Sequence, residues 1–381
     1  MIITPTPEFN SKLTDIIVEL QEIRNHKVFG STEPWLFYEL KNLFHIVEAL
    51  ASARIEGNHT TLASFVEKKI DKTSTDDERL IEISNLIEAL NFIDENIDTT
   101  SINAQFMFEL HKIVVKNLSA NREGDSRPGA YRNEQRWISN SSHTLPQPSD
   151  IRGLMDELYL YIGEENDPKM DLLKIAIAHH RFVWIHPFGN GNGRTVRLLT
   201  YAMLCKKGFI TPGSARLFNP TAVFAGSRQK YYDMLSVADK ADEESLRIWC
   251  LYVLEGLKDE IEKSQKLADQ EFVKDKLLLP TFMWASERNI TNEVETKILN
   301  RLARKQIIKA NDIKDIWPDS YSHVVVSKRL RKMRDQNFIR PLKLNGREYV
   351  LKLTNNKLTR GILDQMELQG MLPIKVDERA S

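Results

Sequence analysis

The spacing of apolar residues constrains the fold of this chain more than any other feature. In WLFYELKNLFHIVEALASARIEGN, residues 35–58, apolar residues recur at steps of three and four and stop at Gly57. That period places them on one face of an α-helix, and a glycine after the last turn typically ends one. The same rhythm fills residues 8–120, 151–185 and 193–267. We therefore predict a mainly helical protein.

Composition is that of an ordinary globular protein, and it excludes several classes. A chain of 381 residues exceeds what one core usually holds, so we predict two or three domains. Its 53 basic and 53 acidic residues cancel, so net charge indicates no partner. Cys205 and Cys250 lie in helix-like apolar stretches, which favours a reducing compartment without disulfides. With no signal sequence and no apolar run of about 20 residues, we predict a soluble, cytoplasmic protein without membrane contact.

Charge is nevertheless unevenly placed along the chain. Residues 296–353 contain fifteen Lys and Arg against five Asp and Glu. Around them, residues 292–308 and 322–339 have helical patterns, and the next stretch reads as a hairpin with a two-residue turn at Asn345-Gly346. This order of elements resembles a winged helix-turn-helix, which we expect to occupy a small domain over residues 277–381.

The second of these helices carries a basic face that has two interpretations. It would present Lys328, Arg329, Arg331, Lys332 and Arg334. Such a face can lie against DNA phosphates, or it can be the solvated surface of an accessory domain that packs on a partner protein. The pattern alone leaves both open.

A glycine-rich loop, HPFGNGNGR at residues 186–194, lies between two predicted helices. A helix N-terminus with free backbone N–H groups attracts anions, and glycines leave room for a phosphate. Arg194 and Arg197 are three apart on the second helix, where both could reach further phosphates. His186 can take a proton from an incoming hydroxyl near neutral pH. The loop therefore predicts a polyphosphate site at which a hydroxyl attacks phosphorus.

The stretch IHPFGNGNGRTVR resembles the signature of the Fic family, His-x-Phe-x-(Asp/Glu)-Gly-Asn-Gly-Arg-x-x-Arg. It matches at His186, Phe188, Gly191, Asn192, Gly193, Arg194 and Arg197. The resemblance implies a Fic-type helical bundle with a catalytic core over residues 111–268. It also implies transfer of AMP from ATP to a Ser, Thr or Tyr hydroxyl of a target protein, or of the chain itself, with release of pyrophosphate.

Carried over position by position, the resemblance assigns roles within the loop. His186 would be the general base and Phe188 the apolar anchor. The phosphates would be held by Gly191, Asn192, Gly193, Arg194, Thr195, Val196 and Arg197. The family usually has a carboxylate for Mg²⁺ or Mn²⁺ where this chain has Asn190. An amide oxygen binds magnesium more weakly, so Asn190 is a weak candidate ligand that puts metal affinity or rate in doubt.

A second motif lies far upstream, in SARIEGN at residues 52–58. It resembles the inhibitory motif (Ser/Thr)-x-x-x-Glu-(Gly/Asn) of many Fic proteins, through Ser52 and Glu56. The resemblance implies an inhibitory helix at about residues 35–57, within an N-terminal region of residues 1–110. Its Glu56 would pair with Arg197 and keep the γ-phosphate of ATP from seating. A homodimer that blocks or releases this helix would be one form of control.

Two further pieces are assigned through the same resemblance. Residues 130–148 would form the family's flap, a β-hairpin that aligns a strand of the target protein, with Trp137 and Ile138 as target-facing or packing residues. Tyr231 or Tyr232 would line the adenine pocket by stacking, although paired tyrosines on a helix are also common in a core.

One rival interpretation comes from another functional class. The chain could be a DNA-binding regulator whose Fic-like part senses nucleotide and has lost efficient catalysis through Asn190. Because His186 is retained, we favour the enzyme. A dinucleotide fingerprint and a Walker-type phosphate loop are excluded, since helices precede the glycine loop and no Gly-Lys-Ser/Thr follows.

Overall fold

A computed structural model describes residues 2–25, 31–70, 76–138, 143–165, 167–210, 220–317 and 322–377. Helices dominate these ranges, which confirms the predicted class. The N-terminal half contains α1 (Lys12–Asn25), α2 (Pro34–Ile55), α3 (Leu62–Ile70), α4 (Glu78–Asn96), α5 (Ala104–Val114), α6 (Ile151–Gly163) and α7 (Asp171–Ile185). The next elements are α8 (Asn192–Lys206), α9 (Ala222–Ala225), α10 (Arg228–Ala238), α11 (Glu243–Gln265), α12 (Gln270–Phe272) and α13 (Leu279–Glu287). The chain continues through α14 (Glu293–Lys305), α15 (His323–Asp335), β1 (Ile339–Pro341), β2 (Tyr349–Leu351) and α16 (Leu358–Leu368).

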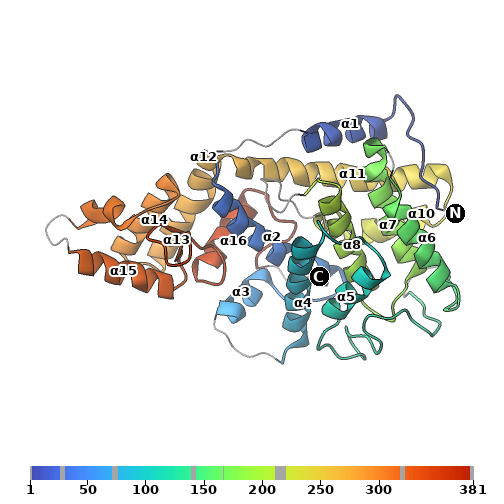
Figure 1. Cartoon of the computed structure of the whole chain (residues 1–381), viewed down its shortest axis with the longest axis horizontal. Helices are drawn as coiled ribbons and strands as arrows, with labels where there is room; N and C mark the ends of the chain where they lie inside the picture. The colour runs from blue at the N-terminus through green and yellow to red at the C-terminus, as the bar shows by residue number, and fades with distance from the viewer. Residues whose placement is uncertain are drawn as a thin grey trace.

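Two antiparallel neighbours, α7 and α8, form the centre of the larger body. α7 packs against α6 and α11, and α8 packs against α4 and α5. Figure 1 shows this body on the right, with the long α11 running along it towards a narrower part that contains α13, α14 and α15. Buried apolar residues form a core that is continuous through both parts. The α7–α8 connection, which carries the glycine loop, therefore lies between well-packed helices.

Local chemistry explains where the helices that carry the site begin and end. Pro34 occupies the first turn of α2, where its missing N–H costs nothing. The helix ends at Ile55 because Gly57 adopts a left-handed conformation with φ of 101°. α7 ends in the same way at His186, with φ of 51°, and Gly191, with φ of 74°, precedes α8. The predicted ends of these three helices agree with the structure to within two residues.

The flap differs from its prediction. No strand is present in the described parts of this segment, residues 130–138 and 143–148, so a paired β-hairpin is not formed there. Residues 139–142 lie outside the described ranges. The two limbs are joined by side chains instead: Arg132 donates to Pro146 O at 2.8 Å, and Gln135 donates to Leu145 O at 3.1 Å. Irregular backbone without a strand ladder takes the place of the predicted strands in these described residues.

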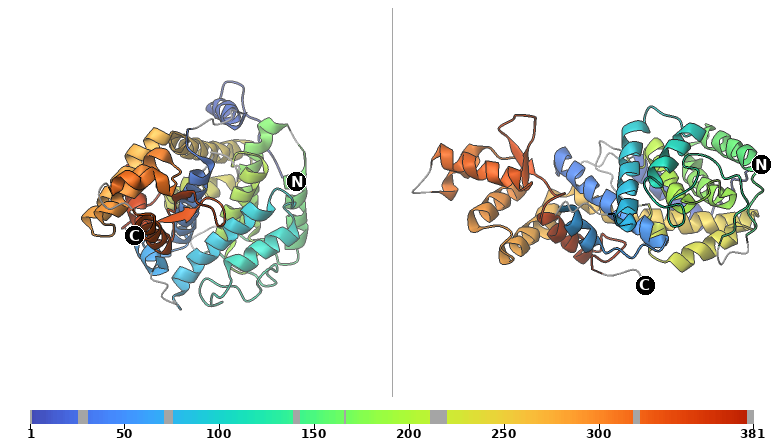
Figure 2. Two further views of the ribbon diagram at one scale, coloured as in Figure 1. Left: turned by 60° about the vertical axis from the view of Figure 1, so that its left-hand side comes forward. Right: turned by 90° about the horizontal axis from the view of Figure 1, so that it is seen from below.

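The C-terminal part contains α14, a short 3₁₀-helix η4 (Ala310–Ile316), α15 and an antiparallel β1–β2 hairpin in which Arg340 pairs with Val350. The hairpin was predicted, but its turn was not placed correctly. Gly346 N donates to Lys343 O at 2.8 Å, so Leu344 and Asn345 are the central residues of a longer loop. The right-hand view of Figure 2 shows the hairpin projecting beside α15. The winged-helix assignment itself stays a prediction.

The predicted start of the last domain does not coincide with a break between helices. The expected start of the last domain at residue 277 falls inside a π-helical turn (Val273–Leu278) that leads directly into α13. The sequence pattern did not indicate α16, which packs against α13 and α3. Among the helices of the described ranges, none is long and apolar enough to cross a membrane. The predicted domain boundaries, homodimer and cytoplasmic location stay predictions.

Candidate active site

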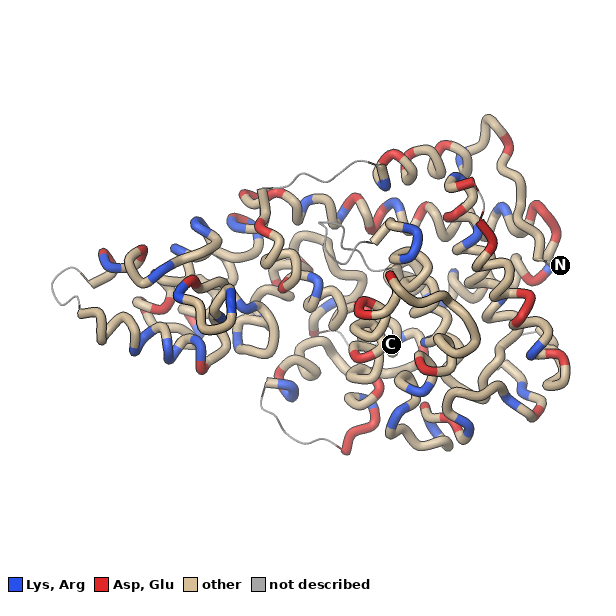
Figure 3. Tube along the Cα trace, in the orientation of Figure 1, with Lys and Arg blue, Asp and Glu red and all other residues tan. Residues whose placement is uncertain are grey.

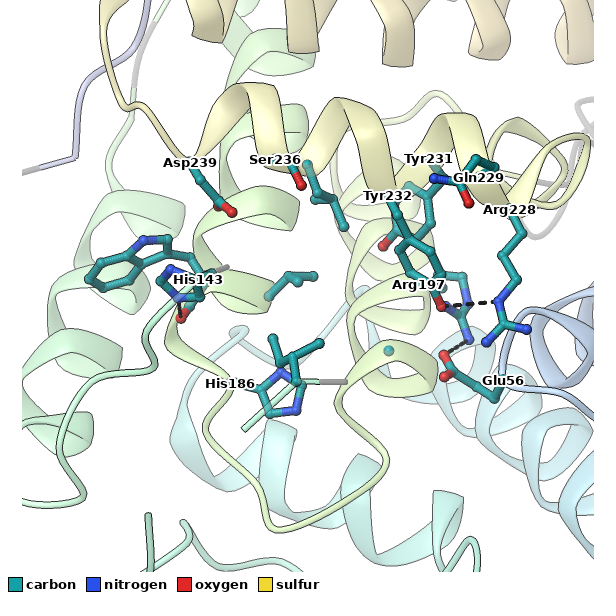
Figure 4. Close-up of a pocket in the computed structure, with 15 residues that line it drawn as sticks. Glu56, His143, His186, Arg197, Arg228, Gln229, Tyr231, Tyr232, Ser236 and Asp239 are labelled. Carbon is teal, nitrogen blue, oxygen red and sulfur yellow. Dashed lines mark hydrogen bonds and ion pairs between the residues drawn. The ribbon is translucent and has the colours of Figure 1, made fainter. Parts of the chain in front are cut away.

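A cavity of about 640 Å³ opens between α10 and the loop that joins α7 to α8. A volume of this size suits a nucleotide. The sequence-predicted residues that line it are Glu56, Ile138, His186, Gly193, Arg197, Tyr231 and Tyr232. Figure 4 shows Glu56, Arg197 and Arg228 grouped at one end, His143 and Asp239 towards the other, and His186 below the space between them.

His186 is the C-cap of α7, where its backbone N–H donates to Phe182 O at 3.0 Å. Its Nδ1 atom is buried and lacks a well-aligned partner, and the ring lies within reach of a backbone hydrogen bond to Val183, so Nε2 is the ring nitrogen left open to the cavity. Burial, helped by the nearby positive charge of Arg132, lowers the pKa of His186 to about 4. The imidazole is therefore neutral at physiological pH, with an open nitrogen that can accept a proton.

Arg132, which the sequence analysis did not single out, holds the backbone at His186. Its Nε donates to His186 O at 2.9 Å, and its backbone N–H donates to Pro187 O at 2.8 Å. The residue is only 4% exposed. A left-handed histidine costs about 1 kcal/mol of backbone free energy, so these bonds help to keep it in that conformation. The predicted flap and the backbone of His186 are thus tied together by one guanidinium.

The loop after His186 is closed by two buried contacts. Phe188 is fully buried and stacks on His111 with 3.8 Å between ring centroids and planes 2° apart. The side chain of Asn192 bonds back to Phe188 twice, at 2.9 Å to its N–H and 2.9 Å to its carbonyl oxygen. Asn192 therefore fixes the loop with its side chain, and it can serve a phosphate only through its backbone N–H.

The first turn of α8 offers donors to an anion. The backbone N–H groups of Asn192, Gly193 and Arg194 have no acceptor among the described residues, as expected at a helix N-terminus. The helix dipole adds partial positive charge at the same place. This turn faces the cavity at Gly193.

Glu56 and Ser52, both at the end of α2, bind the guanidinium of Arg197. Arg197 Nη2 donates to Glu56 Oε1 at 2.8 Å, and its Nε donates to Ser52 Oγ at 2.8 Å. The Arg197 side chain is 1% exposed, yet its Nη1 has no partner in the described part of the chain. A buried, unpaired cationic donor on a cavity wall is unusual, and it marks the place where a further anionic group would bind.

The Glu56 carboxylate also lies against the start of α8. A Cβ atom added at Gly193 would overlap Glu56 Oε1, so only glycine leaves room for the carboxylate. Burial alone would raise the pKa of Glu56, but Arg197, followed by Arg194, holds it below the ordinary value. Glu56 is therefore ionised at neutral pH and places a negative charge on the anion-binding turn.

Five residues predicted to hold phosphate, Gly191 among them, do not line the cavity. Arg194 is 1% exposed and binds Glu82 at 3.0 Å, with a second ion pair to Glu123 at 2.9 Å. Thr195 and Val196 are fully buried beneath the helix, and Asn192 is occupied as described. The side chain of Arg194 thus faces α4 rather than the nucleotide space. Of the seven predicted phosphate contacts, Gly193 and Arg197 line the cavity.

Asn190 does not fit the role of a metal ligand. Its Oδ1 accepts from Gly191 N at 2.7 Å, its Nδ2 donates to Arg122 O at 2.7 Å, and it does not line the cavity. The nearby carboxylate of Asp125 is likewise committed, accepting from Asn190 N at 3.0 Å. No group of three metal-binding side chains occurs in the described ranges. The residues present therefore supply no protein-built site for Mg²⁺ or Mn²⁺ at this loop.

The two tyrosines of α10 differ in their surroundings. Tyr231 is buried, and its hydroxyl contacts His179 Nε2 at 2.8 Å, while Tyr232 is 37% exposed. Both line the cavity, with 5.4 Å between their ring centroids. His179 also bonds Thr200 at 2.7 Å, so this histidine is structural. The open face of Tyr232 is better placed than that of Tyr231 to stack on a base.

The two predicted flap residues also differ in their surroundings. Trp137 is 82% exposed, which does not fit a packing role, and its target-facing role stays a prediction. Ile138 contributes to the cavity wall beside His143. Arg228 and Asp239, at the two ends of α10, also line the cavity and were missed, because an arginine or aspartate at a helix end looks like an ordinary solvated residue.

Comparison with known proteins supports this geometry. Residues 101–204 match the sequence model of the Fic/DOC family. The chain is 31% identical over 199 residues to "Protein adenylyltransferase Fic" of Culex quinquefasciatus, an alignment that covers 50% of this chain and 36% of that protein. Among solved structures it is similar to a Fic family protein from Desulfovibrio desulfuricans G20, with a TM-score of 0.56 and 18% identity, over 92% of this chain and 98% of that one.

A second solved structure agrees. A Fic domain containing signaling protein from Bacteroides thetaiotaomicron VPI-5482 is similar with a TM-score of 0.52 and 17% identity, over 68% of this chain and 98% of that one. At these identities the similarity establishes the fold, and the predicted Fic-type helical bundle is confirmed. The chain spans only about a third, 36%, of the length of the curated relative from Culex.

Proposed function

We propose, from the premise that the chain contains a Fic domain at residues 101–204, that it is a protein adenylyltransferase. It would transfer AMP from ATP to a Ser, Thr or Tyr hydroxyl of a protein, or of itself, and release pyrophosphate. The observation that carries this proposal is that His186 and Arg197, whose buried Nη1 has no partner in the described part of the chain, line one cavity of nucleotide size.

The geometry suggests how each group acts. The target hydroxyl oxygen would attack the α-phosphorus of ATP while His186 Nε2, the ring nitrogen that is not buried, takes its proton. The bond from the α-phosphorus to the oxygen that bridges to the β-phosphate would break, and pyrophosphate would leave. The N–H groups at the start of α8 and the Arg197 guanidinium would stabilise the negative charge of the phosphates. His186 can take the proton only if the target hydroxyl reaches it. We assign to the flap and Trp137 the role of holding the target in that position.

Binding of the adenosine follows from the walls of the cavity. Tyr232 would stack on the adenine, and Tyr231 would position it from below. Arg228, whose guanidinium carbon lies 5.5 Å from the centre of the Tyr232 ring, would keep that ring in place. The other end of the cavity, at Asp239, offers an acceptor to a polar edge of the base or ribose.

We also propose that Glu56 inhibits this activity. Its carboxylate pairs with Arg197 and lies against Gly193, the place where an outer phosphate would need to bind. ATP would then bind without correctly seating its γ-phosphate. Removing Glu56 would break the ion pair that Arg197 forms at 2.8 Å and free that side of the guanidinium.

The experiment that tests the proposal follows label from ATP carrying it at the α-phosphate, with Mg²⁺ present. Wild type, Glu56→Gly and His186→Ala are compared, with Glu22→Gly, an exposed change on α1, as the matched glycine control. Label on protein should rise in Glu56→Gly, stay at the wild-type level in Glu22→Gly and be lost in His186→Ala. A Glu56→Gly protein that transfers nothing, or a His186→Ala protein that transfers equally, contradicts the proposal. ATP labelled at the γ-phosphate distinguishes phosphorylation.

A further inference from the structure

A second cavity, of about 670 Å³, lies in the C-terminal part of the molecule, remote from the candidate active site. Four of its lining residues carry Lys or Arg side chains: Lys309, Arg331, Arg334 and Arg347. None of the described residues that line it is acidic. Low-dielectric walls that carry charge of one sign concentrate ions of the opposite sign. The cavity therefore favours a polyanion.

The basic side chains come from separate elements that the fold brings together. Lys309 precedes η4, Arg331 and Arg334 belong to α15, and Arg347 lies in the β1–β2 loop. Figure 3 shows Lys and Arg following one another along α15 at the narrow end of the molecule. Neither Arg331 nor Arg347 forms an ion pair within the described ranges, and both are exposed. Two of the charges at the cavity are thus available to a ligand.

The predicted basic face of α15 is only partly free. Arg329 and Lys332 both bind Glu295 of α14, at 3.0 and 3.2 Å, and that carboxylate is 2% exposed. These two side chains therefore tie α15 to its own domain, which corrects the prediction that all five basic residues face outwards. Lys328 and Arg331 remain on the open side of the helix.

The shape of this open side favours duplex DNA among polyanions. Val324, 74% exposed, begins a stripe that continues along the helix through Lys328 and Arg331. A helix of this kind fits the major groove of B-form DNA, where an exposed valine can contact a thymine methyl group. The major groove of an RNA duplex is too narrow for a helix. Single strands are usually held by stacked aromatic rings, and Tyr349 is the only Tyr, Trp or Phe among the lining residues.

We propose that the C-terminal part binds duplex DNA, with α15 in the major groove and with Arg331 and Arg347 on backbone phosphates. This site is separate from the proposed AMP transfer and does not depend on it. Because the contacts are mainly to phosphate, binding should weaken steeply with salt and vary little with base sequence.

The test uses the full chain and a fluorescent duplex of about 20 base pairs, or two helical turns. Anisotropy is followed between about 50 and 200 mM salt. Arg331→Glu and Arg347→Glu should each weaken binding about tenfold and make the logarithmic salt slope shallower by about one. Lys276→Glu is the control, because it also replaces a positive by a negative side chain, at an exposed site outside the cavity. It should retain wild-type binding.

Four outcomes would overturn the proposal. They are no duplex binding, binding that does not depend on salt, equal or tighter binding of the matched single strand, and an equal loss in Lys276→Glu. Circular dichroism and the thermal midpoint of each variant show whether it is folded. If one arginine variant is unfolded, the other one and Lys328→Glu, which lies on the same open stripe, decide the question.

A different observation concerns the inhibitory helix itself. α2 is held at its N-terminal end by the C-terminal part: Glu39 Oε1 accepts from Arg340 Nε at 3.0 Å, and Glu39 Oε2 accepts from Leu353 N at 3.0 Å. Glu39 is 2% exposed. A third contact runs from Glu33 N to Gln306 Oε1 at 2.8 Å. The other end of the same helix carries Glu56, about 25 Å away at 1.5 Å per residue.

We infer that the Glu39 contact sets the position of α2, and through it the strength of inhibition by Glu56. This inference rests on the proposed function. Because α2 is one continuous helix from Pro34 to Ile55, a contact that fixes its N-terminal end also constrains where Glu56 lies at its C-terminal end. Loosening the contact should let α2 move and release Arg197, so ATP affinity should rise.

The test measures ATP binding in the His186→Ala background, so that affinity is separated from chemistry. Arg340→Gln should tighten ATP binding about fivefold. Arg360→Gln, which breaks ion pairs of the C-terminal part with Glu67 and Asp377 but does not touch α2, should leave it unchanged. Adding Arg340→Gln to Glu56→Gly should give no further increase.

The outcomes separate this inference from the proposed function. If Glu56→Gly tightens ATP binding and labels protein while Arg340→Gln does neither, the inference on Glu39 is wrong and the proposed function stands. If Glu56→Gly also leaves ATP binding unchanged, the proposed inhibition by Glu56 is itself wrong. A comparable gain in Arg360→Gln would indicate general loosening and would overturn the inference as well. Glu39→Gln, which retains the acceptor for Leu353 N, repeats the test from the other partner.

Discussion

The carboxylate of Glu56 lies 2.8 Å from Arg197 Nη2 and at the same time against the backbone of Gly193. The Glu56 side chain thus binds the Arg197 guanidinium and lies at the N-terminus of α8. An outer phosphate of ATP would need both of these groups. The remaining donor of the guanidinium, Nη1, is left unpaired. Inhibition in this arrangement would be competition between two anions for one site, and it would not require His186 to move.

Removing that anion should strengthen nucleotide binding. We expect Glu56→Gly to bind ATP about tenfold more tightly than the parent in the His186→Ala background, because a charge-assisted contact to Arg197 becomes available to the γ-phosphate. Calorimetric titration measures the change. ADP, which has no γ-phosphate, is the control and should gain less. An equal gain for AMP would show that the carboxylate blocks the cavity as a whole rather than the outer-phosphate position.

The pH profile of transfer should report a strongly lowered histidine pKa. His186 has a pKa of about 4, so the imidazole loses its proton well below neutrality and is a competent base from about pH 5 upwards. Protonation below that pKa removes the base, so kcat/KM should fall only on the acid side of about pH 5. Measured with Glu56→Gly, an acid limb near pH 6.5 would contradict the buried, neutral state of His186.

Arg132 should act as a positioning residue. It binds the carbonyl groups of His186 and Pro187 on one side and that of Pro146 on the other. Arg132→Ala should remove the guanidinium bonds to His186 O and Pro146 O, while the backbone bond to Pro187 O stays, and it should lower kcat by at least about tenfold, with little change in the Kd of ATP, because the residue does not line the cavity. Stability should fall by about 2 to 3 kcal/mol, measured by urea unfolding.

The conservative variant supplies the control for Arg132. Arg132→Lys keeps the charge but can replace only part of the fork of donors, so it should recover stability more than activity. Should both variants unfold equally and lose ATP binding, the residue would be structural only, without a specific effect on the base.

Asn190 should prove to be a brace for the loop rather than a metal ligand. Its two amide atoms are used by Gly191 N and Arg122 O. Asn190→Ala should therefore cost about 1 to 2 kcal/mol of stability while the Mg²⁺ concentration for half-maximal transfer stays unchanged. Both are measured in the Glu56→Gly protein, by urea unfolding and by Mg²⁺ titration at fixed ATP. A several-fold rise in the Mg²⁺ requirement would instead identify Asn190 as a ligand.

The sequence by itself determined the helices and the order of the loop. The three- and four-residue period located α2, α7 and α8, because helix formation depends on hydrogen bonds between residues four apart. The resemblance of residues 186–197 and 52–57 then indicated that His186, Arg197 and Glu56 belong together, and the structure brings them to one cavity. These features rest on short-range spacing and on a motif whose geometry is largely local.

Only the tertiary structure decided which way the remaining side chains face. Arg194 binds Glu82, 112 positions away in the sequence, because α4 packs beside α8. The spacing of residues within the motif cannot predict this contact. Arg132 reaches His186 across 54 positions for the same reason. A buried charge takes the partner that packing brings to it, since leaving it unpaired costs several kcal/mol. The choice between a phosphate and a carboxylate is therefore made by neighbours that are distant in sequence.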